Sequence, residues 1–161
     1  MNKKEAEFEH LVREQRSTIY TVCYMFSNDA DEVADLFQDA LINLWRGFDG
    51  FRGESKASTW VWRVTLNTCI SADRKKKRSG ERAPLELAGD FFEDKDAETK
   101  QIRQLHERIR RLQPVDRALV LLWLEDLSYE EIGDIVGISE KNVSVKLVRI
   151  KKQLIEMSKN E

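Results

Sequence analysis

The segment Leu127–Leu154, LSYEEIGDIVGISEKNVSVKLVRIKKQL, constrains the fold of this chain more than any other. Ser128 and Glu131 have the spacing of a capping box, which predicts the start of a short helix. Gly137 supplies a turn, and Ser139 can cap a second helix. The apolar residues of that second helix recur at helical spacing, at Val143, Leu147, Ile150 and Leu154. The pattern predicts a helix-turn-helix, whose second helix has the form that enters a major groove of DNA.

The solvent-facing side predicted for the second of these helices is basic. Its cations are Lys141, Lys146, Arg149, Lys151 and Lys152. The whole chain of 161 residues nevertheless has a net charge of −2. That balance is unusual for a protein that binds DNA by itself. The sequence therefore indicates a DNA-binding motif within a protein that is not basic overall.

Helical periodicity covers both ends of the chain and is interrupted in the middle. Residues 1–79 and 101–161 carry apolar residues at three- and four-residue spacing, without the sustained alternation that is typical of strands. Residues 80–100 hold three basic and seven acidic residues, two glycines and a proline, which is typical of a linker. We therefore expect an all-α fold in which two small helical domains are joined by an acidic linker.

The N-terminal domain is predicted to contain three helices, two of which have distinctive surfaces. In the second helix an apolar stripe lies opposite a polar face that includes Asp35, Gln38, Asp39 and Asn43. The third helix is expected from about Thr59 to Arg78 and ends in the basic run RKKKR. It carries Trp60 and Trp62 close to cations, an arrangement that suits unpaired bases and a phosphate backbone. The alternative is that these tryptophans belong to the core.

The sequence gives no positive sign of catalysis, of a cofactor or of membrane insertion. There is no phosphate-binding loop, nucleophile elbow or Cys/His pair with useful spacing. Glu7 and His10 form only half of a di-iron motif, since the second Glu-x-x-His is missing. Cys23 and Cys69 fall in helical patterns and are expected to be buried, reduced thiols. We expect a cytoplasmic protein that is not an enzyme and binds no metal.

Three blocks of the chain together resemble the extracytoplasmic-function sigma factors, small bacterial initiation factors that consist of the second and fourth sigma regions. The segment Asp35–Leu41, DLFQDAL, is similar to the region 2.2 motif of that family. Residues 51–67, with FRGES followed by Thr59, Trp60 and Arg63, are similar to regions 2.3 and 2.4. Residues 112–139, with LQP, SYEEI and GIS, are similar to region 4. The resemblance covers nearly the whole chain.

The resemblance implies three binding surfaces. The surface for core RNA polymerase would comprise Asp35, Gln38, Asp39 and Asn43. The expected partners within the polymerase are the clamp helices of its largest subunit and the beta flap. The surface for the minus-ten element of promoter DNA would comprise Phe51, Arg52, Gly53, Glu54, Ser55, Lys56, Trp60, Trp62, Arg63, Asn67, Arg74 and Lys75. The surface for the minus-thirty-five element would comprise Ser139, Lys141, Asn142, Lys146, Arg149 and Lys151. The resemblance also implies a possible anti-sigma factor as a partner.

The resemblance further bears on the domains and on the positions that depart from the family. It identifies residues 1–79 as sigma region 2 and residues 101–161 as sigma region 4, with residues 80–100 either threading the RNA path of the polymerase or acting as a plain tether. Ala34, Ala57, Gly133 and Asn142 stand where the family usually has other residues. We expect these departures to affect the promoter sequence and not the class of function.

Two other classes of function remain open from the sequence. A helix-turn-helix regulator that acts without core polymerase would explain residues 127–154 but not the polar face and the tryptophan-rich helix of the N-terminal domain. A sigma-like interaction protein would bind polymerase or an inhibitor without starting transcription. Dependence on core polymerase distinguishes the first alternative, and run-off transcription distinguishes the second.

Overall fold

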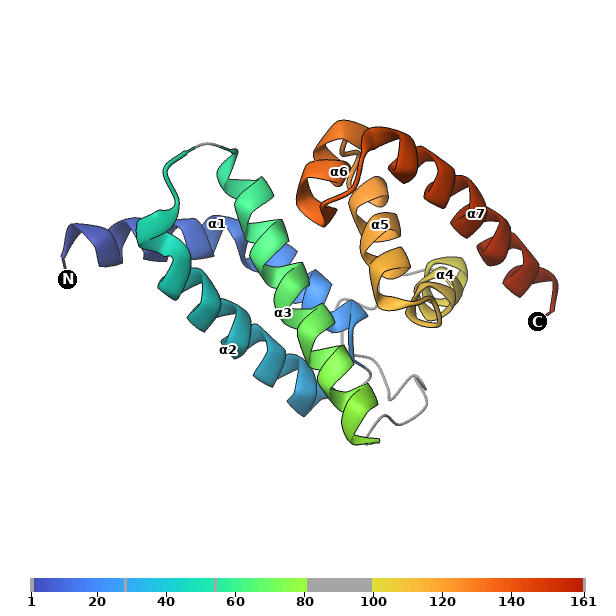
Figure 1. Ribbon diagram of the computed structural model, residues 1–161. Coiled ribbons are helices and arrows are strands. Elements are labelled where there is room, and N and C mark those ends of the chain that lie inside the picture. Colours follow the sequence, from blue (N-terminus) through green and yellow to red (C-terminus); the bar gives the residue numbers. More distant parts are fainter. Residues whose placement is uncertain (1, 28, 54, 81–99, 161) are drawn as a thin grey trace. The chain divides into compact units, whose positions relative to one another are not determined.

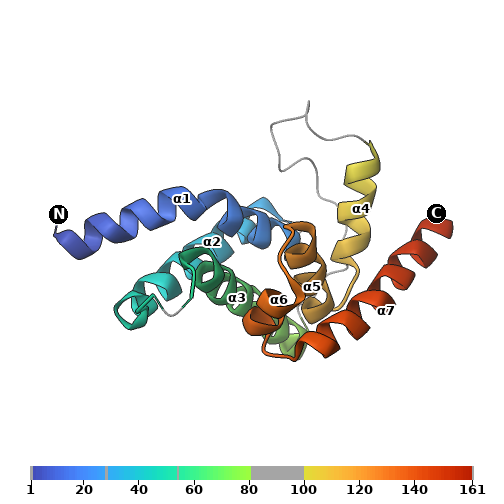
Figure 2. The same cartoon turned by 90° about the horizontal axis from the view of Figure 1, so that it is seen from above.

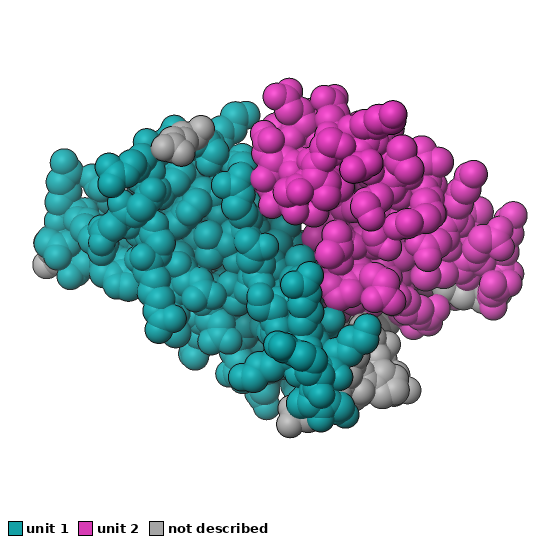
Figure 3. Space-filling model, viewed as in Figure 1, with its two compact units in different colours: residues 1–82 teal, residues 83–161 magenta. Residues whose placement is uncertain are grey.

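The computed structural model describes residues 2–27, 29–53, 55–80 and 100–160, and these residues form seven α-helices and one 3₁₀-helix (Figure 1). No strand occurs in these ranges, so the predicted all-α fold is confirmed. The chain divides into two compact units, residues 1–82 and residues 83–161 (Figure 3). Apart from Gly80 and Lys100, the linker predicted for residues 80–100 lies outside the described residues.

Unit 1 is a bundle of three long helices, which Figure 2 shows from a second direction. Its elements are α1 (Lys3–Met25), α2 (Ala30–Gly47), the 3₁₀-helix η1 (Phe48–Gly50) and α3 (Ala57–Ser79). α3 packs against both α1 and α2. The fully buried core side chains include Ile19, Val22, Leu44 and Val61, each with no exposed surface.

The ends of these helices follow from local capping. The Asn2 side chain accepts a hydrogen bond from the backbone N–H of Glu5, and Asp29 accepts one from Asp31 at the start of α2. α3 begins at Ala57, two residues earlier than the predicted Thr59, because the backbone N–H of Trp60 already donates to the carbonyl of Lys56. Cations occupy its last turn, where they interact favourably with the helix dipole.

The described residues of unit 2 form four helices, and a buried arginine of the second one contacts the end of the first. They are α4 (Lys100–Arg110), α5 (Pro114–Leu124), α6 (Tyr129–Val136) and α7 (Glu140–Lys159). Arg117 in α5 has no exposed surface, and its Nη2 donates to the carbonyl oxygens of Arg110 at 2.8 Å and Leu112 at 3.0 Å. A charged donor thus satisfies carbonyl groups at the C-terminal end of α4, where a helix leaves its acceptors unpaired.

The predicted helix-turn-helix is confirmed in α6 and α7. Ser128 and Glu131 form a reciprocal capping box. Gly137 ends α6 in the left-handed region, at a φ of 86°, and the Ser139 side chain caps α7. Gly133 lies in α6, and a Cβ atom there would stand 2.6 Å from the carbonyl oxygen of Ile138. This departure from the family pattern therefore bears on packing of the turn.

We predict that Gly133→Ala lowers the free energy of unfolding by up to about 2 kcal/mol, since overpacking usually costs about 1–3 kcal/mol. The Ile138 carbonyl is backbone, and the Ile138 N–H is held by the Gly133 carbonyl at 3.1 Å, so the clash is not easily relieved. Alanine's better helix propensity, worth about 1 kcal/mol, offsets only part of this cost. Urea unfolding measures the change.

The matched control is Gly50→Ala, because a Cβ at Gly50 meets no atom within 4 Å and its φ is not positive. It should leave the urea midpoint nearly unchanged. A Gly133→Ala protein as stable as the parent would show that the close approach does not constrain the turn.

Candidate nucleic-acid interface

The polar face predicted for α2 is present and exposed. Asp35, Gln38 and Asp39 are all exposed, whereas the apolar stripe of the same helix is buried. The buried residues of that stripe are Val33, Leu36, Ala40 and Leu44. Because the three polar side chains take no part in the core, they are available to a partner and can be substituted without removing core contacts.

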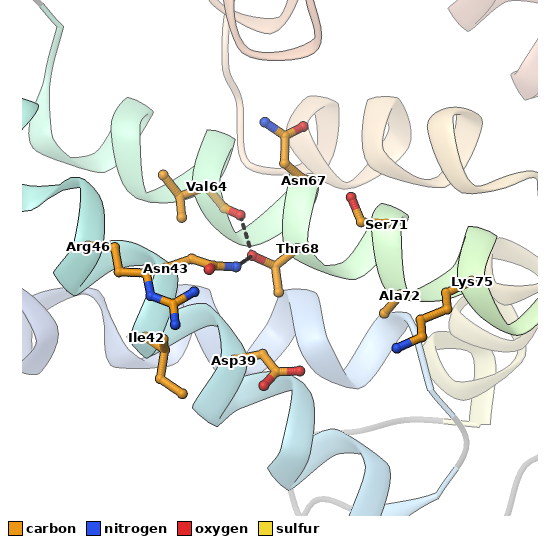
Figure 4. A pocket seen from close by; sticks show the side chains of 10 residues that line it. All are labelled: Asp39, Ile42, Asn43, Arg46, Val64, Asn67, Thr68, Ser71, Ala72 and Lys75. Carbon is orange, nitrogen blue, oxygen red and sulfur yellow. Dashed lines mark hydrogen bonds between the residues drawn. The ribbon is translucent and has the colours of Figure 1, made fainter.

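The fourth residue predicted for that face, Asn43, lies in a groove between α2 and α3 (Figure 4). Its Nδ2 donates to the Thr68 hydroxyl at 2.9 Å, and that hydroxyl donates to the Val64 carbonyl at 2.8 Å. The groove has a volume of about 590 Å³. Its lining residues are Asp39, Ile42, Asn43, Arg46, Val64, Asn67, Thr68, Ser71, Ala72 and Lys75. The groove is therefore lined both by two residues predicted to bind polymerase, Asp39 and Asn43, and by two predicted to bind DNA, Asn67 and Lys75.

An aromatic cluster supports the loop between η1 and α3. Phe51 stacks on Trp60, with ring centroids 4.9 Å apart and an interplanar angle of 24°. Phe48 lies 6.3 Å from Trp60 and 5.3 Å from Phe8, which also contacts Trp45 edge-on at 5.1 Å. Aromatic pairs at these separations are stabilising beyond their burial. Phe51 and Trp60 thus anchor the start of the loop and of α3.

The loop itself presents its polar residues at the surface. Arg52, Gly53 and Lys56 are exposed and Ser55 is half-buried, while Glu54 lies outside the described residues. Gly53 has a φ of 74°, a conformation that side chains with a Cβ rarely adopt. The described residues of the predicted minus-ten loop are therefore mostly exposed, and the Phe51–Trp60 stack packs beneath them.

The assignment of Trp62 to the DNA surface is corrected by its burial. Its side chain is only 6% exposed and belongs to the core of unit 1, whereas Trp60 is half-buried. Residues 60, 61 and 62 are all apolar, so the sequence could not say which ring faces inward. Burial removes Trp62 from any surface that could contact a base directly.

The C-terminal part of α3 carries a basic surface. Asn67, Arg74 and Lys75 are exposed and Arg63 is half-buried. A second cavity is lined by Ser71, Arg74, Lys77 and Arg78. Lys77 and Arg78 belong to the basic run RKKKR that was predicted at the end of this helix. A neighbouring cation of that run, Lys76, instead forms an ion pair with Glu32 of α2.

On α7, two cations in the later part of the helix contact residues of α5. Lys141 and Asn142 are exposed near its start, and Lys146 is half-buried one turn further on. Arg149 forms an ion pair with Asp116 of α5 at 3.5 Å, and the Lys151 ammonium lies 4.2 Å from the Trp123 ring centroid. Neither Asp116 nor Trp123 was predicted, because more than twenty residues separate each from its partner in the sequence.

Ser139 has a structural role at the start of this helix. Its hydroxyl oxygen accepts the backbone N–H of Asn142 at 3.1 Å. This bond satisfies one of the donors that a helix start leaves open. Ser139 is exposed, and its hydroxyl oxygen fixes the beginning of α7 through that cap.

The described residues offer neither a metal-binding cluster nor a membrane-spanning helix. They contain no group of three or more His, Cys, Asp or Glu side chains placed to hold a metal ion. None of their helices combines the length and apolar character needed to cross a membrane.

Comparison with known proteins identifies both units. Residues 11–79 match the family described as Sigma-70 region 2, and residues 102–154 match Sigma-70, region 4. Two such units in this order define a sigma-70-type initiation factor. The chain belongs to the extracytoplasmic-function RNA polymerase sigma factors, which are transcription initiation factors and not enzymes.

Several relatives of this group align with most of the chain. SigW of Bacillus subtilis is 27% identical over 168 residues, which cover 93% of this chain and 90% of that protein. The sigma-E factor of Escherichia coli is 29% identical over 137 residues, which cover 76% and 72%. SigG of Mycobacterium tuberculosis is 26% identical over 183 residues and 95% of this chain, but the chain spans only 49% of SigG.

Two solved structures share the fold. The sigma factor RpoE of Bartonella quintana, in complex with the anti-sigma factor NepR, has a TM-score of 0.79 at 20% identity and covers 95% of this chain and 97% of its own. CnrH, in complex with the cytosolic domain of CnrY, has a TM-score of 0.71 at 18% identity, covering 98% and 90%. These likenesses support the architecture of the two units.

Proposed function

We propose that this protein binds core RNA polymerase and directs it to promoters, by melting the minus-ten element and reading the minus-thirty-five element. The observation that carries the proposal is the occurrence of two different surfaces in one chain: the exposed polar face of α2 and a complete helix-turn-helix in α6 and α7. A regulator that acts on duplex DNA alone needs only the second surface.

The polymerase surface is proposed to be the exposed face of α2. Asp35, Gln38 and Asp39 offer carboxylate and amide groups that suit a basic and hydrogen-bonding partner. Asn43 is proposed to act at the edge of this face, since its amide already contacts Thr68 across the groove. The groove continuing to Asn67 and Lys75 would bring the bound polymerase close to the strand that α3 holds.

The minus-ten surface is proposed to be the loop after η1 together with the outer side of α3. Extruding a base from a duplex costs a few kcal/mol. A loop fixed on the Phe51–Trp60 stack can receive such a base without having to order itself first. The exposed Arg74 and Lys75, with Lys77 and Arg78, would hold the phosphates of the separated strand.

The minus-thirty-five surface is proposed to be the N-terminal half of α7. Lys141, Asn142 and Lys146 lie in its first two turns, where recognition helices contact base edges. Lysine suits guanine and asparagine suits adenine. Arg149 and Lys151 lie later in the helix and are held by Asp116 and Trp123, which suits contacts with phosphates at fixed positions.

Two further features belong to the proposal. We place the protein in the cytoplasm, where its polymerase and promoter partners are found. We also propose that an anti-sigma factor is a partner of this chain. Support comes from the solved structures of similar fold, which are complexes of RpoE with NepR and of CnrH with CnrY.

The polymerase surface is tested by the double variant Asp35→Ala with Gln38→Ala. We expect its affinity for core polymerase to fall about tenfold, equivalent to about 1.4 kcal/mol, because two central polar contacts are lost. The fold should survive, since both side chains are exposed. Polymerase pull-down and thermal melting are measured in parallel.

The control for that variant is Glu14→Ala, which removes an exposed carboxylate from α1. It should bind polymerase as the parent does. Unchanged binding by the folded double variant would show that this face of α2 is not the polymerase surface.

The upstream surface is tested by comparing Lys146→Ala with Lys152→Ala in the holoenzyme, on a panel of minus-thirty-five variants. Lys146→Ala should change which bases are preferred, at a cost of about 1–3 kcal/mol at the affected position. Lys152, exposed and later in α7, should act on phosphates, so its loss weakens all promoters alike and reduces the salt slope by about one. Lys151 is a poorer test of a phosphate contact, because its ammonium also packs on the Trp123 ring.

Transcription yield across the panel decides between the two roles. If Lys146→Ala lowers every promoter by a common factor, then Lys146 contacts phosphate and the base-reading assignment fails.

A further inference from the structure

The proposed function assigns no role to Val145 of α7. It is 61% exposed, the largest exposed fraction among the large apolar side chains of the described residues. The apolar stripe that packs α7 into unit 2 is formed by Val143, Leu147 and Ile150, each with no exposed surface. Val145 is therefore not part of the core, and its two methyl groups face solvent.

The position of Val145 on α7 is more informative than its exposure. Lys141 lies four residues before it and Arg149 four residues after it, so these cations are one turn away on the same face. Asn142, three residues before it, borders that face as well. Val145 thus lies in the middle of the surface that is proposed to enter the major groove, in the second turn of the helix.

Helix stability does not explain a valine at this exposed position. A β-branched side chain loses rotamer freedom in a helix, so most polar residues would serve the helix as well or better. The same restriction holds the two methyl groups in nearly one orientation. A rigid apolar group can contact an apolar partner without losing further freedom on binding.

We propose that Val145 reads the C5-methyl group of a thymine in the minus-thirty-five element. Among the four bases of DNA, thymine alone presents a methyl group in the major groove, and the other edges present hydrogen-bonding atoms there. A valine opposite those atoms would remove them from water without replacing their hydrogen bonds. The inference rests on the proposed function and adds a specificity residue to it.

The test removes single methyl groups from the DNA. A promoter is first selected by transcription with the holoenzyme from a library with random minus-ten and minus-thirty-five elements. Each minus-thirty-five thymine is then replaced in turn by deoxyuridine, which keeps every hydrogen-bonding group. At one position we expect holoenzyme binding to fall about fourfold for the parent protein, the factor for one lost methyl contact.

Val145→Ala should bind the thymine promoter more weakly and show no more than a small difference between thymine and deoxyuridine at that position. The control is Val148→Ala, which removes the same group from a site that is 53% exposed one turn later. It should keep the fourfold difference. Circular dichroism checks that both variants retain their helices.

Two results would overturn the inference alone. In the first, transcription depends on the minus-thirty-five element but no thymine-to-deoxyuridine change affects binding, which leaves the proposed function intact. In the second, Val145→Ala retains the full difference. If transcription does not depend on that element at all, the upstream part of the proposed function fails together with the inference.

Discussion

The burial of α3 between α1 and α2 is the constraint on which the surface of unit 1 depends. Val61, Leu66 and Cys69 of α3 are at most 2% exposed, so one side of that helix is committed to the core. Only its outer side, its loop end and its basic C-terminal end remain for a partner. The same packing turns the apolar stripe of α2 inward and leaves Asp35 and Gln38 outside. The burial of the apolar residues of α2 and α3 thus determines where the polar binding groups lie on the surface.

In unit 2, contacts with backbone carbonyl groups help to place the helices. The charged side chain of Arg117 closes the end of α4, and Gly133 allows α6 to approach the turn that leads into α7. The close approach at Gly133 and the Ser139 cap fix the first turn of α7. Asp116 and Trp123 of α5 then hold two cations of the helix, Arg149 and Lys151. A recognition helix gains from such support, because side chains that are already ordered lose less freedom on binding.

The sequence predicted those features that depend on local spacing. The capping box of α6, the turn at Gly137 and the buried and exposed faces of α2 all follow from patterns within one or two helical turns. It could not separate Trp60 from Trp62, because apolar residues at 60, 61 and 62 cover most of the helix circumference. It also could not give the contacts of Asn43 with Thr68 or of Arg149 with Asp116, since these depend on how separate helices pack.

The most direct test of the account is run-off transcription with purified core polymerase and this protein, on a library of random promoter elements. We expect initiation only when both protein and core polymerase are present, with selected sequences at the minus-ten and minus-thirty-five positions. The protein alone, with its net charge of −2, should bind the same duplex weakly. Tight and sequence-specific binding of duplex DNA by the protein alone, without initiation in the presence of core polymerase, would contradict the account.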